Sequence, residues 1–198
     1  MKYLLLRQWR FNAADIAYKL CDKTTQNMID CDVSRYLKWN KKMDKESRVQ
    51  RLNYCLLTIV EFRNVFYFRT RKHKFWSGFS KAFLKPADGV EIGGDIAEGL
   101  FISHHTAVVF PKKAGKNLRV GPGVVIGKNR GECPEIGNNV YIASNSTVIG
   151  GIHIGDNVII GAGSVVTKDV PSGGVYAGNP VKLIRQIKDD PQLCNEIM

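Results

Sequence analysis

The chain has 198 residues and a formal net charge of +11, a length that suits one sizeable core or one core with a smaller appendage. Its five cysteines are widely separated and lack CxxC spacing, which argues against a zinc site and indicates reduced thiols. The longest apolar run, residues 54–60, is about a third of the ~20 residues that a bilayer span requires. The three leucines near the start are too short an apolar core for a secretion signal. We therefore expect a cytoplasmic protein without a transmembrane helix.

Charge and glycine content both divide the chain near Lys85. Residues 1–85 hold 19 Lys or Arg and 7 Asp or Glu, a net charge of +12, whereas the remaining 10 basic and 11 acidic residues give −1. Of the 19 glycines, only Gly78 precedes this point. The sequence therefore predicts a basic N-terminal subdomain, residues 1–85, and a second domain of different architecture, residues 86–198.

The N-terminal subdomain is predicted to be α-helical. Residues 12–83 contain one glycine and no proline, and their apolar residues recur at helical spacing. A first helix is expected around Ile16–Leu20, a second from Val33 to Met43, and a third over residues 46–70, with Val49 on its apolar side.

A six-residue period follows Pro86, which neither an α-helix nor an alternating strand produces. Every sixth residue is aliphatic or alanine in two runs, which are Val90, Ile96, Ile102, Val108, Ala114, Val120 and Ile126, and then Ile136, Ile142, Val148, Ile154, Ile160 and Val166. The next positions are often Gly, Asn, Asp or Ser, which tolerate a left-handed backbone conformation. This pattern predicts a β-solenoid with three short strands per coil. The jump in phase between the runs predicts a projecting loop at residues 127–135.

These repeats resemble the left-handed parallel β-helix of the hexapeptide acyltransferases, and residues 89–185 resemble the serine acetyltransferase branch. Besides the repeat, the resemblance rests on GLFISHHTAVVF at residues 99–110, the projecting loop, and VYAGNPVKLIR at residues 175–185. It implies a left-handed parallel β-helix preceded by a small α-helical subdomain and followed by a C-terminal tail. It also implies acetyl-CoA as co-substrate, no metal, and a homotrimer with active sites between neighbouring subunits.

Acetyl transfer to a hydroxyl requires a base, and a neutral imidazole suits this role. Of the four histidines, His73 lies in a basic run and His153 on a repeat face, so both are expected to be solvated. The residues alone leave His104 and His105 equivalent, and the resemblance places the catalytic function on His104.

A catalytic imidazole is usually oriented by a carboxylate, and the family places this acid about one coil earlier. There the sequence GVEIGGDIAEG is two residues shorter than the family pattern, so Glu91 and Asp95 are both candidates, with Glu91 favoured.

The acceptor side departs from the serine acetyltransferases. Their aspartate before the catalytic histidine is Ser103 here, and the second histidine in their projecting loop is Cys133. Ser103, His105 and Cys133 are predicted to contact the acceptor. Because both changes remove charge or hydrogen-bonding capacity, we expect a sugar or lipid-linked sugar in place of a charged amino acid.

The donor side is predicted from the same resemblance. Small residues on adjoining repeats are expected to line the pantetheine arm, and basic residues to meet the nucleotide phosphates. These candidates are Ala143, Gly161 and Ala162 for the arm, and Lys168, Lys182 and Arg185 for the phosphates.

The segment EFRNVFYFRTRKHKFW, residues 61–76, interleaves aromatic and basic side chains. It suits a helix on an anionic membrane surface, a nucleic-acid patch, or aromatic side chains that pack on the solenoid. A similar FRNxFY segment in capsule and exopolysaccharide acetyltransferases favours the peripheral membrane contact, at the inner membrane face, with no nucleic acid partner.

The main hypothesis is an acetyl-CoA-dependent O-acetyltransferase that modifies a sugar hydroxyl of a capsule or exopolysaccharide precursor, with His104 as general base. Two alternatives remain open: a serine O-acetyltransferase of cysteine biosynthesis, and a non-enzymatic solenoid that binds membranes or nucleic acid.

Overall fold

The computed structural model describes residues 13–39 and 47–187. The chain forms two compact units, which meet in sequence between Ala87 and Asp88. The second unit is a parallel β-solenoid and the first is helical, so the predicted fold class is confirmed. The N-terminal leucines, Met43 and the C-terminal tail with Cys194 lie outside the described residues.

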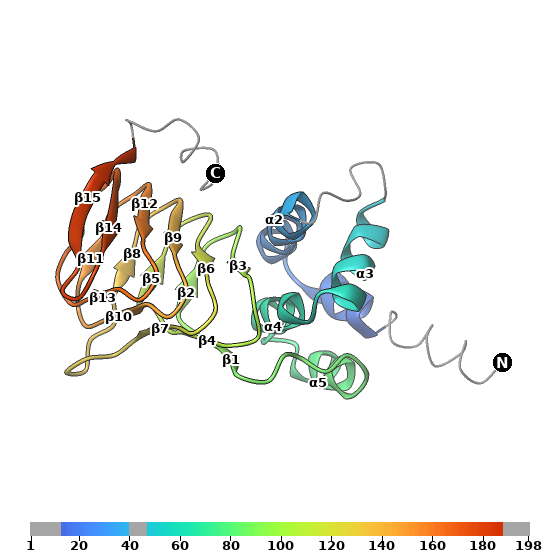
Figure 1. Cartoon of the computed structure of the whole chain (residues 1–198). Helices are drawn as coiled ribbons and strands as arrows, with labels where there is room; N and C mark the ends of the chain where they lie inside the picture. Colours follow the sequence, from blue (N-terminus) through green and yellow to red (C-terminus); the bar gives the residue numbers. More distant parts are fainter. Residues whose placement is uncertain (1–12, 40–46, 188–198) are drawn as a thin grey trace. The chain divides into compact units, whose positions relative to one another are not determined.

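The helical unit contains five helices within the described residues. They are a helix at residues 13–20, α2 (Lys23–Trp39), α3 (Arg48–Thr58), α4 (Val60–Arg69) and α5 (Lys74–Phe83) (Figure 1). None of the helices in the described part of the chain is long and apolar enough to cross a bilayer.

The single helix predicted over residues 46–70 is wrong, because the chain breaks between α3 and α4. Ile59 has an extended backbone, with φ −118° and ψ 102°. It lies in a run of three β-branched residues, whose restricted χ1 angles lower their helix propensity slightly. Arg63 stabilises the break, since its guanidinium donates to the carbonyl of Leu56 at 2.7 Å and to that of Leu57 at 2.9 Å. Val49, predicted to face inward, is 49% exposed.

Helix α4 carries the aromatic segment and forms the centre of the helical unit. Phe62 and Phe66 are fully buried, and the ring of Phe62 meets Tyr36 edge-on at 5.2 Å between centroids. At the end of the helix, buried Arg69 donates from Nε to the buried carboxylate of Asp32 at 2.9 Å. The prediction that these aromatics lie on a membrane surface is therefore wrong for α4. They pack within the helical unit.

Fifteen short strands form three parallel sheets along the β-helix, closed by one antiparallel strand (Figure 1). Sheet A consists of β1 (Val90–Ile92), β4 (Ala107–Val109), β7 (Val124–Gly127), β10 (Thr147–Ile149) and β13 (Val165–Val166). Sheet B consists of β2 (Asp95–Ile96), β5 (Lys113–Ala114), β8 (Glu135–Ile136) and β11 (His153–Ile154). Sheet C consists of β3 (Phe101–Ile102), β6 (Arg119–Val120), β9 (Val140–Ile142), β12 (Val158–Ile160), β14 (Gly174–Ala177) and antiparallel β15 (Lys182–Gln186).

The core is a stack of aliphatic side chains inside these coils, and the six-residue period predicts it with one error. Val108 was expected to point inward, but it lies beside Glu91 and Val125, which are exposed on the outer face of sheet A. Its neighbours Ala107 and Val109 are buried instead, at 3% and 0% exposure. The corner between Ile102 and Ala107 contains one additional residue, so the inward position moves from Val108 to Val109.

The corner between sheets B and C repeats one backbone conformation in every coil. Its residues have a left-handed φ, namely Gly99 (82°), Asn117 (62°), Asn139 (54°), Asn157 (54°) and Gly173 (78°). The Asn117 side chain donates to the Asn139 Oδ1 at 2.9 Å, and Asn139 donates in the same way to Asn157 at 2.9 Å. Asparagine and glycine adopt this conformation most readily, so these corners superpose and keep the coils in register.

Glycines at other corners are required by close approach between coils. A Cβ on Gly121 would lie 2.7 Å from the backbone nitrogen of Ser144, whereas one on Gly127 would meet nothing within 4 Å. We expect Gly121→Ala to lower stability by about 1–3 kcal/mol through overpacking and to lower Tm by several degrees, while Gly127→Ala leaves Tm nearly unchanged. Thermal unfolding followed by circular dichroism checks this, and equal effects of the two variants would contradict it.

Candidate active site

His104 lies in the corner between sheets C and A, called here the C/A corner, where the chain is locally wider. Each corner is counted here up to the first buried residue of sheet A, which is Ala107, Val124, Ser146 or Ser164 in successive coils. The first C/A corner then spans residues 103–106, whereas the next three span three residues each, 121–123, 143–145 and 161–163. Each shorter corner ends in a left-handed residue, namely Gly123 (φ 68°), Asn145 (58°) and Gly163 (68°), and none of residues 103–106 has a positive φ. The additional residue leaves the side chains of His104 and His105 exposed.

The residue before His104 begins a stack of equivalent positions along this corner. Ser103, Gly121, Ala143 and Gly161 each donate their amide to the last inward residue of sheet C in the next coil, at 3.0, 2.9, 2.8 and 2.8 Å. Because neighbouring strands lie 4.7–4.9 Å apart, the stack extends roughly 14 Å from Ser103 to Gly161. Gly121 was not among the predicted donor residues, although the six-residue repeat places it in this row.

The stack consists of small residues because the coils approach closely there. A Cβ on Gly161 would lie 2.9 Å from the Cβ of Ala177 in the following coil. The hydroxyl of Ser103 is held within the corner, where it donates to the carbonyl of Val120 at 3.1 Å. The row therefore offers a narrow surface of backbone and small side chains that leads away from His104.

The other predicted donor residues divide between two corners. Ala162 is exposed beside Gly161, and Lys182 begins β15 opposite Ala177, at the same corner. Arg185 lies three residues farther along β15. Lys168 follows β13 at the corner between sheets A and B, called here the A/B corner. A single chain therefore brings Lys182, but not Lys168, to the stack.

The two candidate acids lie on different sheets. Glu91 is exposed on sheet A beside Val108, and sheet A adjoins the C/A corner. Asp95 is exposed on sheet B opposite Lys113, away from that corner. Neither carboxylate hydrogen-bonds His104 within the described residues, but only the position of Glu91 is on a sheet that borders it.

The projecting loop between β7 and β8 begins with a tight hairpin turn. The amides and carbonyls of Asn129 and Glu132 exchange hydrogen bonds at 2.9 and 3.2 Å. Between them Arg130 and Gly131 both have positive φ, at 53° and 90°, the pattern of a type I′ turn. Cys133 follows this turn and is partly exposed.

His104 and Cys133 lie at opposite ends of sheet A. His104 precedes the first residue of β4, whereas the loop with Cys133 follows the last residue of β7, the parallel neighbour of β4. One chain therefore does not bring these two predicted site residues together.

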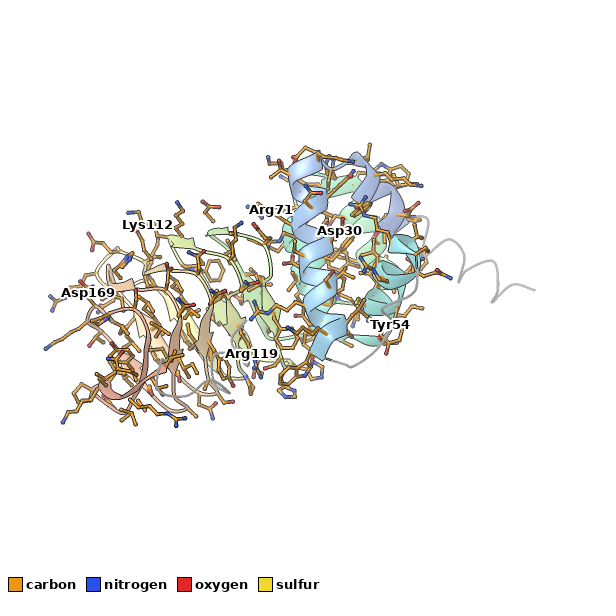
Figure 2. All side chains as sticks on the ribbon, turned by 90° about the horizontal axis from the view of Figure 1, so that it is seen from above. Asp30, Tyr54, Arg71, Lys112, Arg119 and Asp169 are labelled. Carbon is orange, nitrogen blue, oxygen red and sulfur yellow. The ribbon has the colours of Figure 1, made fainter. Side chains whose placement is uncertain are left out.

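Beneath the loop, a cavity of about 660 Å³ is lined by charged residues. Lys112 donates from Nζ to the Glu135 carboxylate at 2.6 Å. This hydrogen bond and the charge of Lys112 lower the pKa of Glu135, and the same contact raises the pKa of Lys112. Lys112 and Asp169, which both line the cavity, are labelled at the surface of the β-helix in Figure 2.

Residues 133–168 match the family described as bacterial transferase hexapeptide (six repeats). Serine acetyltransferase 2 of Arabidopsis thaliana is 36% identical over 138 residues, which cover 62% of this chain and 43% of that protein. Serine acetyltransferase of Staphylococcus aureus strain Mu50 is 42% identical over 106 residues, 50% of each chain. The chain thus spans about half the length of the curated relatives it matches.

The fold has the same relatives. The crystal structure of Neisseria gonorrhoeae serine acetyltransferase in complex with serine has a TM-score of 0.65 and 25% identity, over 83% of this chain and 70% of that chain.

These relatives correct the prediction of a sugar acceptor. That prediction rested on Ser103 and Cys133, two departures from the serine acetyltransferase pattern, but relatives that are 36% and 42% identical to this chain over the matched residues are serine acetyltransferases. The hypothesis of a capsule or exopolysaccharide precursor as acceptor is therefore wrong. Two neutral side chains were too little evidence for a different class of acceptor.

The described cysteines differ in exposure, which gives a direct test of the loop. Cys55 is fully buried, and burial raises its pKa to about 12, so only about 10⁻⁴ of it is thiolate at pH 8. Burial also raises the pKa of Cys21. We expect iodoacetamide at pH 8 to alkylate Cys133 and exposed Cys31 at least about tenfold faster than Cys21 and Cys55, measured by peptide mass spectrometry. Protection of Cys133 equal to that of Cys55 would show that the loop does not project.

Proposed function

We propose that this protein is an acetyl-CoA-dependent O-acetyltransferase that acetylates the hydroxyl of L-serine, with His104 as the general base. The observation that carries the proposal is the widened C/A corner, which exposes an imidazole at one end of a row of small residues. The hexapeptide repeats and the serine acetyltransferase relatives support the same chemistry.

In the proposed reaction, neutral His104 removes the proton from the serine hydroxyl, and the oxygen attacks the thioester carbonyl of acetyl-CoA. The new C–O bond forms, the tetrahedral intermediate collapses with cleavage of the C–S bond, and His104 returns its proton to the leaving thiolate. The products are O-acetylserine and CoA. Backbone N–H groups of the C/A corner are proposed to stabilise the oxyanion.

We assign the orientation of His104 to Glu91, because it lies on the sheet that borders the C/A corner. A carboxylate there would fix the imidazole tautomer and stabilise the imidazolium that forms during proton transfer. Asp95, on sheet B, is proposed to remain a solvated residue.

The donor is proposed to lie along the stack from Ser103 to Gly161. Ala143, Gly161 and Ala162 would contact the pantetheine arm, whose amides can hydrogen-bond exposed backbone groups. Lys182 and Arg185 would meet the phosphates from the β15 end of the same corner. Lys168 could reach a donor only from a neighbouring subunit.

We further propose a homotrimer, because the catalytic base and the projecting loop lie at opposite ends of sheet A. In a closed ring of identical chains, the C/A corner of one subunit can face the A/B corner of the next. His104 and His105 of one chain would then meet Cys133 of its neighbour across a shared acceptor site. Since Ser103 and Cys133 are neutral, serine is expected to bind more weakly than the family pattern implies.

The proposal predicts turnover with L-serine that depends on His104. His104→Ala is expected to lower kcat by about 10²–10⁴, the usual contribution of a positioned base. The matched control His73→Ala removes a histidine of the helical unit and should leave kcat nearly unchanged. Release of the CoA thiol from acetyl-CoA, with and without L-serine, measures both. Absence of serine-dependent release by the wild-type protein, or an equal loss in the two variants, would contradict the proposal.

A further inference from the structure

Helix α5 presents two of its four aromatic residues to solvent and both of its serines to the interior, which is unusual for a surface helix. Phe75 is 74% exposed and Phe79 40% exposed, whereas Ser77 and Ser80 are 4% and 0% exposed. The exposed side chains are spaced by four residues, so they share one face of the helix. Phe79 also contacts Phe83 edge-on at 5.2 Å between ring centroids. Neighbouring exposed aromatic rings of this kind form a candidate interaction site.

The charged residues of the segment that carries this face all have the same sign, although Asp22 from the start of the chain lies near Lys72. No Asp or Glu occurs between Glu61 and Asp88. Of the seven basic residues in this interval, Arg69 pairs with buried Asp32, and Arg63 donates to backbone carbonyls at the end of α3. The other five are exposed and lie on or beside α5, namely Arg71, Lys72, Lys74, Lys81 and Lys85.

Local contacts hold some of these cations beside the aromatic face. The Arg71 guanidinium (Figure 2) lies 4.1 Å from the ring centroid of Phe68 and donates to the Phe68 carbonyl at 2.8 Å. The Lys81 ammonium lies 5.1 Å from the ring centroid of Tyr67. The cations therefore flank the exposed phenyl rings without an acidic partner on the same segment.

We propose that α5 docks the helical unit onto an anionic lipid surface. Phenyl rings that enter the boundary between headgroups and acyl chains, with lysines directed at lipid phosphates, are the arrangement of an interfacial amphipathic helix. A second copy of the same face is a poor occupant, because a two-fold contact would oppose like charges. Binding of α5 to lipid does not depend on the proposed acetyltransferase activity.

Binding of the full-length protein to vesicles tests the proposal. Wild type should co-sediment with vesicles of phosphatidylcholine and phosphatidylglycerol, less strongly as salt is raised, and much more weakly with phosphatidylcholine alone. Phe75→Ser with Phe79→Ser should lower the partition coefficient by at least about tenfold, because two phenyl rings lose their burial. The same variant should retain the wild-type melting temperature and serine-dependent turnover.

The matched control replaces two exposed apolar residues of α3, Val49→Ser with Leu57→Ser, which are 49% and 37% exposed. This control should bind vesicles like wild type. Equal loss in both double variants, or no preference for anionic vesicles, overturns the proposal. Binding of a single-stranded oligonucleotide, lost in the Phe75 and Phe79 variant while vesicles are not bound, would assign the face to nucleic acid and also overturn it.

Discussion

Each coil of the β-helix has to satisfy the backbone amides and carbonyls of the coil before it, and this requirement determines where the chain can vary. Along the corner between sheets B and C, Asn117, Asn139 and Asn157 share one left-handed backbone conformation and hydrogen-bond through their side chains. A larger or β-branched residue at these positions would have to adopt a strained φ. The extra residue at 103–106 and the projecting loop therefore occur at the other two corners, and most of the candidate site residues lie there.

At the C/A corner, a single additional residue changes a structural turn into a candidate site. In the three-residue corners, Gly121 and Gly161 lie so close to the next coil that a Cβ at either position would clash with it. The four-residue corner exposes His104 while Ser103 keeps its place in the amide ladder. The row of small residues from Ser103 to Gly161 thus allows the coils to stack, and it is also the row along which we propose that acetyl-CoA binds. Stability and donor binding should respond together to a larger side chain at Gly121.

The repeat architecture could be predicted from the sequence because one aliphatic residue per strand faces the core in nearly every strand. The error at Val108 arose from the inserted residue, which a strict period cannot register. The break at Ile59 depends on the Arg63 side chain and on packing, which local helical spacing does not reveal. The sequence did not separate the aromatic residues of α4, which are buried, from Phe75 and Phe79 of α5, which are exposed, because this division depends on tertiary contacts. His104 was selected as the candidate base through a family motif, since its residue type alone left His105 equivalent.

The proposed catalytic centre is made by two chains, because His104 and Cys133 lie at opposite ends of the strands of sheet A. The most direct measurement is complementation between His104→Ala and a variant whose hairpin, residues 129–132, is replaced by two glycines. Each variant alone should be inactive. Co-expressed at equal levels, they should recover about a quarter of wild-type serine acetylation, since one site in four pairs an intact histidine with an intact loop in a randomly mixed ring. No recovery from co-assembled chains would place the whole site within one subunit and contradict the account.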